Sequence, residues 1–326
     1  MEIQNIKLDK KSATFIVPNW CKRYGGILIG LIALLIFFSF KSPYFFTQDN
    51  LMNILLQVSI IAIAAFGMTY VLLLGEIDLS IGSIIAMVGT LAALSLSHEL
   101  SLFSVIPLAI LAALLLGMMN GLLSASLGIP SFIVTVATMG IFRGISSIFL
   151  DGASISIEHE GFIAIGNGEW FSIPIPIWIM IALLLVNHFI LSKTVFGRKI
   201  YLTGGNKEAA IYSGIKVISL KIKVFMVMAA MAGTSGLILA SRLNSAQANA
   251  GIGYELDAIA AAVLGGTSLS GGYGTVIGTF IGAIIIGVIN NGMNLLNVPY
   301  FYQLIVKGVV ILIAVYIDVQ SKKRRT

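Results

Sequence analysis

Residues 102–125 read LFSVIPLAILAALLLGMMNGLLSA, a run of 24 residues without a charged side chain. As an α-helix this run would be about 36 Å long, because each residue adds about 1.5 Å. The hydrocarbon core of a bilayer is about 30 Å thick, so the run is long enough to cross it. The stretch therefore predicts a membrane-spanning helix.

The rest of the chain repeats this pattern. Of its 326 residues, 58% are apolar and 10% are charged, whereas about 25% of residues are charged in soluble domains. Its mean hydropathy is +0.99. We expect an all-α, polytopic membrane protein with about ten transmembrane helices, although nine or eleven passes stay open. The predicted spans lie near residues 24–40, 51–73, 81–97, 102–125, 131–150, 174–191, 221–241, 257–271, 274–291 and 299–317.

The basic residues indicate an orientation, because Lys and Arg concentrate in the cytoplasmic loops of membrane proteins. Sixteen of the 20 Lys and Arg residues lie in a leader (1–23), a loop (192–223) and a tail (319–326). Residues 151–171 include four acidic residues and no basic one, as expected of an outward-facing loop. We therefore expect both termini in the cytoplasm, with a transmembrane domain over 24–318 and 192–223 as its cytoplasmic coupling loop.

Several classes of function lack the residues that they need. The chain has no Gly-x-x-x-x-Gly-Lys-Ser/Thr loop to hold nucleotide phosphates, and its single cysteine, Cys21, offers no metal-binding pair. His98, His159 and His188 lie in separate segments without a His-Glu-x-x-His pattern. The net charge of +6 follows membrane orientation rather than nucleic-acid binding. We therefore expect a non-catalytic protein without cofactor, metal or nucleic acid.

The longest predicted cytoplasmic connection contains a short helix. Asn206 is a favourable N-cap, Glu208 suits the first turn, and Gly214 is a natural stop. A capped surface helix flanked by basic residues would suit docking against a soluble subunit. The alternative is an ordinary polar connector.

Glycine patterns indicate close helix packing and a possible internal repeat. Gly274, Gly278 and Gly282 recur every four residues, which places small surfaces on one helix face. Residues 74–82 (LGEIDLSIG) are echoed at 264–272 (LGGTSLSGG). Transporters are often built from internal repeats, but a chance match in low-complexity sequence is the slightly better explanation of this echo.

Polar residues within the predicted spans are candidates for a gate or pathway, because they are costly in hydrocarbon. Lys307 lies well inside the last span and could instead form a structural ion pair with Glu255 or Asp257. The other candidates have structural alternatives too, since Asp78 and Ser80 could cap a helix. Asn290 and Asn294 could bond neighbouring helices.

Three segments resemble the ribose-transporter permease family of bacterial ATP-driven (ABC) importers. They are GEIDLSIGS (75–83), GYELDAIAAAVLGGTSLSGGYGTVIGT (253–279) and NNGMNLLNVPYFYQLIVKGVVILIAVYID (290–318). The resemblance runs from about residue 45 to 318. It implies a subunit in the inner membrane, surrounded by lipid, that forms a translocation pathway with a second permease copy, as a homodimer or a heterodimer.

The resemblance also implies two soluble partners, a cytoplasmic ABC ATPase and a periplasmic sugar-binding protein. The residues expected to couple to the ATPase are Asn206, Glu208, Ala209, Ala210, Ser213 and Gly214. Ribose is the expected sugar, with allose, xylose, galactose and autoinducer-2 as alternatives. The rival hypothesis is a self-sufficient secondary sugar transporter or channel, because composition alone fits that class equally well.

Overall fold

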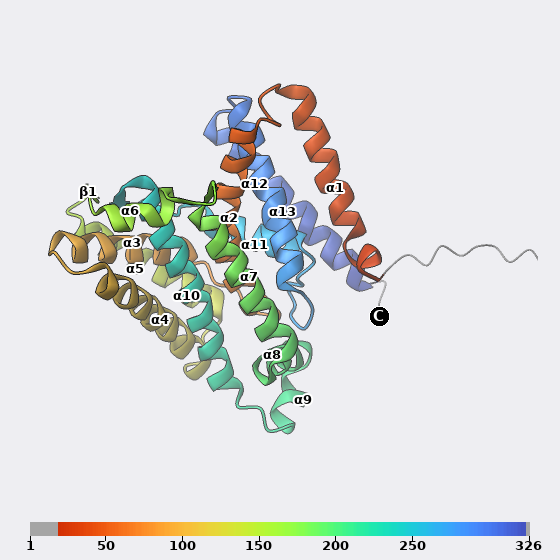
Figure 1. Ribbon diagram of the computed structural model, residues 1–326. Coiled ribbons are helices and arrows are strands. Elements are labelled where there is room, and N and C mark those ends of the chain that lie inside the picture. The colour runs from red at the N-terminus through yellow and green to blue at the C-terminus, as the bar shows by residue number, and fades with distance from the viewer. Residues whose placement is uncertain (1–18, 324–326) are drawn as a thin grey trace, which may run out of the picture.

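The computed structural model describes residues 19–323, which fold into a bundle of helices with four short strands (Figure 1). Residues 1–18, most of the predicted leader, and 324–326, the end of the predicted tail, lie outside the described part. The predicted all-α, polytopic membrane fold is confirmed at this level.

Within the described residues, six helices are long and apolar enough to cross a bilayer. They are α2 (Gln48–Leu73), α4 (Leu102–Ser126), α5 (Ser131–Phe149), α7 (Ile175–Lys193), α10 (Val217–Leu243) and α12 (Val276–Leu295). Shorter apolar segments lie in three further helices, α1 (Asn19–Lys41), α3 (Ile81–Ser97) and α13 (Tyr300–Lys323). These nine helices coincide with nine of the predicted spans.

The predicted span at 257–271 is wrong in its second half. The structure has α11 over Tyr254–Leu264, 11 residues, which at about 1.5 Å per residue is too short to cross a bilayer alone. Gly265 ends the helix and Gly266 has a φ of +85°, a conformation that favours glycine. Residues 265–275 then form an irregular turn, and the count of ten crossings stays a prediction.

The centre of the bundle is formed by α2, α10 and α12. Helix α10 packs against α2, α3 and α4, while α12 packs against α2 and α11 (Figure 1). Close packing depends on glycine: a methyl group at Gly282 of α12 would overlap the carbonyl of Ala261 in α11. The Gly278 and Gly282 positions therefore allow the close backbone approach that their spacing predicts, but Gly274 precedes the first residue of α12 and is not on its face, so that part of the prediction is wrong.

Small elements lie at opposite ends of the bundle (Figure 1). At one end, β1 (Ser154–Ser156) pairs antiparallel with β4 (Ser245–Gln247), next to α6 (Glu160–Asn167). There, β2 (Glu169–Trp170) also pairs with β3 (Ile173–Pro174). At the other end lie α8 (Val195–Gly205) and α9 (Lys207–Tyr212).

Candidate functional site

Helix α9 is the short helix that the sequence predicts at the expected docking site. The Asn206 side chain accepts a hydrogen bond from the Ala209 N–H at 2.9 Å, so the predicted N-cap is confirmed. Ser213 Oγ donates to the Ala209 carbonyl at 2.8 Å, and Gly214 follows with a φ of +77°. Glu208 lies in the first turn, and Ala210 is buried. The six predicted coupling residues therefore form one compact capped unit.

The helix before it, α8, was not predicted. Thr194 caps it by accepting a hydrogen bond from the Gly197 N–H at 3.2 Å. A threonine at the start of a helix is a recognised N-cap signal, so this helix could have been found from sequence. Asn206 is the single residue between α8 and α9, which leaves little slack between the two helices.

The surface around α9 combines apolar and basic side chains. Tyr212 is 90% exposed and Ile211 52% exposed, large values for bulky side chains. A groove of about 340 Å³ is lined by Lys207 and Ile211 of α9, by the start of α10, and by the end of α4 with the turn before α5. Glu76 and Lys221 lie in the same groove. Such a surface is suited to a protein partner.

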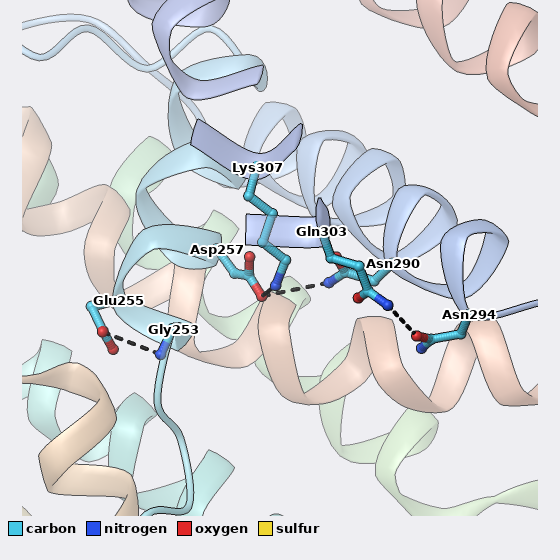
Figure 2. A network of polar contacts seen from close by, with 7 residues as sticks. All are labelled: Gly253, Glu255, Asp257, Asn290, Asn294, Gln303 and Lys307. Carbon is cyan, nitrogen blue, oxygen red and sulfur yellow. Dashed lines mark hydrogen bonds and ion pairs between the residues drawn. The ribbon is translucent and has the colours of Figure 1, made fainter. Parts of the chain in front are cut away.

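Lys307 belongs to a polar network that joins three helices (Figure 2). Its Nζ lies 2.9 Å from Oδ2 of Asp257 on α11, and Asn290 of α12 donates to the same oxygen at 3.5 Å. Of the two partners that the sequence suggests, Asp257 forms the ion pair. Glu255 instead accepts a hydrogen bond from the Gly253 N–H.

Asn294 lies one turn beyond Asn290 and has a different partner (Figure 2). Its Oδ1 accepts a hydrogen bond from Gln303 of α13 at 2.9 Å, and its side chain is exposed. Gln303 was not among the predicted site residues. The structure thus brings Asn290, Asn294 and Lys307 to one α12–α13 seam.

Asp78 and Ser80 form a separate cluster in the turn between α2 and α3. Asp78 Oδ1 accepts hydrogen bonds from the Ser80 N–H at 2.7 Å and from Ser80 Oγ at 2.6 Å. Asn120 of α4 donates to Ser80 Oγ at 2.8 Å. All three side chains are fully buried. Asp78 rather than Ser80 therefore holds the start of α3, since Ser80 makes no capping bond itself.

A second ion pair was missed because it links distant parts of the chain. Lys221 Nζ of α10 lies 2.6 Å from Oε1 of Glu76, in the turn after α2. Among the residues whose side chains the structure describes, this pair and Lys307–Asp257 are the two ion pairs. Both cations sit on helices that the sequence predicts as membrane spans.

Comparison with known proteins extends over nearly the whole chain. Residues 50–315 match a family described as branched-chain amino acid transport system, permease component. The ribose import permease protein of Haemophilus influenzae is 48% identical over 89% of this chain and 91% of its own length. For the Bacillus subtilis ribose import permease protein the values are 46%, 90% and 92%. For the L-arabinose ABC transporter permease protein of Azospirillum brasilense they are 39%, 92% and 88%. No solved structure matches the chain.

Proposed function

This chain belongs to the family described as branched-chain amino acid transport system, permease component, and we propose that it is the membrane subunit of an ATP-driven ribose importer. It is a multi-pass protein of the inner membrane. The observation that carries the proposal is its identity of 43–48% to ribose import permeases over about nine tenths of the chain.

Ribose is favoured over L-arabinose because the ribose permeases are the more similar relatives. The L-arabinose permeases share 39% identity with the chain. Both sugars are pentoses with similar hydroxyl groups, so the difference in identity decides between them. In the proposal a separate periplasmic protein selects the sugar, and the permease provides its route.

Energy comes from a separate ATPase in this proposal, because the chain has no phosphate-binding loop. The ATPase docks on α9, where Tyr212 and Ile211 supply exposed apolar surface and Lys207 supplies charge. Asn206, Glu208, Ala209, Ala210, Ser213 and Gly214 hold the shape of that docking helix. The rival secondary transporter has no use for such a helix.

Contacts between loops support the proposed orientation. The segments expected in the cytoplasm meet: the Gly272 N–H donates to the Leu73 carbonyl at 2.9 Å, and Lys221 pairs with Glu76. Two segments expected outside also meet through β1 and β4. Both termini are then cytoplasmic, and the exposed acidic residues of 151–171 face the binding protein.

The translocation pathway forms between two permease copies in this proposal. Asn294 is exposed on the α12–α13 seam and offers an amide to sugar hydroxyls. Asp78 and Ser80 belong to a gate, because their buried cluster controls the turn between α2 and α3. Asn290 and Lys307 line the seam and meet at Asp257.

Uptake in reconstituted vesicles tests the function. Vesicles containing this chain are assayed with radiolabelled ribose, with and without the ATPase and the binding protein. We expect uptake only when both partners and ATP are present, with L-arabinose competing less well than unlabelled ribose. Ribose uptake by this chain alone would overturn the proposal and establish the secondary transporter.

A further inference from the structure

The two segments that echo each other in sequence, 74–82 and 264–272, contact each other in space. The Gly272 N–H donates to the Leu73 carbonyl at 2.9 Å, directly before the first segment. A methyl group at Gly75 would lie 3.3 Å from the Ser270 carbonyl oxygen. The turn after α2 and the turn after α11 therefore form one contact, here called the turn pair (residues 74–80 and 265–275).

The last turn of α8 inserts against this turn pair. A methyl group at Gly204 would overlap the Leu73 carbonyl and lie 2.7 Å from the Gly272 nitrogen. One at Gly271 would lie 2.7 Å from the Gly204 carbonyl oxygen and 2.9 Å from the Gly75 nitrogen. The backbones of α8 and of the two turns therefore lie too close together to leave room for a side chain at Gly204 or Gly271. Helix α8 contacts both turns.

Two side chains hold the same elements together. Tyr201 of α8 donates its hydroxyl to the Gly274 carbonyl at 2.9 Å. Lys221 of α10 lies 2.6 Å from Glu76 in the other turn. Tyr201 precedes α9 and Lys221 follows it, so the elements on both sides of the docking helix are attached to the turn pair.

The connections to α9 are short. Asn206 alone joins α8 to α9, and residues 213–216 join α9 to α10. Because these connections are so short, α9 cannot be displaced without moving the helices on either side of it. A displacement of α9 moves α8 and the start of α10. These elements then move the two turns from which α3 and α12 begin.

We propose that Tyr201, Gly204 and Lys221 are positioning residues that transmit movement of the docking helix to the turn pair, and so to α3 and α12 together. This inference rests on the proposed function, because it requires an ATPase on α9. It adds a route by which one docking event drives two turns of the membrane domain.

Adjacent glycines provide a matched test in the complete transporter, reconstituted with its ATPase and sugar-loaded binding protein. Gly204→Ala places a methyl group inside the junction, whereas at Gly205 the methyl meets no atom within 4 Å. We measure co-purification of the ATPase, basal ATP hydrolysis, and the stimulation of hydrolysis by the binding protein. Loss of stimulation with retained assembly separates transmission from folding.

We expect Gly204→Ala to retain the ATPase and to lower stimulation at least about 5-fold, the lower end of typical couplings between sites. Gly205→Ala should keep the stimulation of the wild type. Equal stimulation in the two variants would overturn the inference. A wild-type transporter without any ATPase stimulation would instead overturn the proposed function.

If Gly204→Ala fails to assemble with the ATPase, milder variants test the inference. Tyr201→Phe removes one hydroxyl, and Lys221→Gln removes one charge, with Lys223→Gln, an exposed neighbour, as control. We expect the first two to reduce stimulation while Lys223→Gln does not, and the charge exchange Glu76→Lys with Lys221→Glu to restore part of it. Full stimulation in both Tyr201→Phe and Lys221→Gln would contradict the inference.

Discussion

Replacing Lys307 by Met should destabilise the folded permease by about 3 kcal/mol. Lys307 Nζ and Asp257 Oδ2 are 2.9 Å apart, and the side chains are 17% and 5% exposed. At an effective dielectric constant of about 20, two unit charges at that distance attract by about 6 kcal/mol, from which desolvation is subtracted. Breaking a buried pair costs about 3–5 kcal/mol, and a lone charge in a membrane helix about 2.5–3.5 kcal/mol. The two ranges overlap near 3 kcal/mol.

The double variant Asp257→Asn with Lys307→Met separates the pair from its individual residues. The amide introduced by Asp257→Asn would keep a polar partner for Asn290, which contacts Asp257 in the wild type. We therefore expect the double variant to lie within about 1 kcal/mol of the wild type, because neither charge is left unpaired. The measurement is unfolding by sodium dodecyl sulfate in mixed micelles, followed by tryptophan fluorescence, with the exposed Lys223→Met as control.

Two results would refute this reasoning. A loss of less than about 1 kcal/mol in Lys307→Met would mean that the charge is solvated rather than paired. A double variant as unstable as the single one would mean that the packing of the Lys307 side chain, rather than its charge, stabilises the contact between α13 and α11. A stable double variant that fails in uptake would assign the pair a transport role besides its structural one.

Three further predictions concern other parts of the molecule. Asn206→Ala removes the cap of α9, and its loss of about 1 kcal/mol should appear as weaker co-purification of the ATPase. Asp78→Asn keeps an oxygen for the bonds from Ser80, so the permease should fold but lose uptake; unchanged uptake and ATPase coupling would contradict the gate. Gly282→Ala should cost about 1–3 kcal/mol by overpacking α12 on α11, measured by the same detergent unfolding. Gly140→Ala, which meets nothing within 4 Å, should leave unfolding unchanged.

Features encoded within a few residues were predictable from sequence. Asn206, Glu208 and Gly214 lie within nine positions of each other, and capping depends on that local spacing alone. The long apolar runs were equally predictable, because each run must by itself form a helix as long as the bilayer is thick. The spacing of Gly278 and Gly282 correctly indicated close packing, although it could not identify α11 as the neighbour.

Features that depend on distant contacts were not predictable. The predicted span over 257–271 failed for a local reason instead, because average hydropathy hides the helix-breaking effect of Gly265 and Gly266. Nothing near Glu76 in sequence indicates Lys221, since the ion pair depends on how α10 packs beside α2. For Lys307 the sequence narrowed the partner to two carboxylates, and the helix packing selects Asp257.

The two ion pairs differ in a way that matches the two tasks assigned to them. The difference lies in the carboxylates, since Asp257 is 5% and Glu76 24% exposed, whereas Lys307 and Lys221 are similar at 17% and 13%. Water reaches the Glu76 carboxylate more than it reaches Asp257, so separating Lys221 from Glu76 costs less than breaking a pair whose carboxylate is buried. A buried pair costs several kcal/mol to break, which suits an element that stays in place. In the proposed mechanism Lys221–Glu76 therefore lies where movement of α9 would reach the turn pair, whereas Lys307–Asp257 holds α13 on α11.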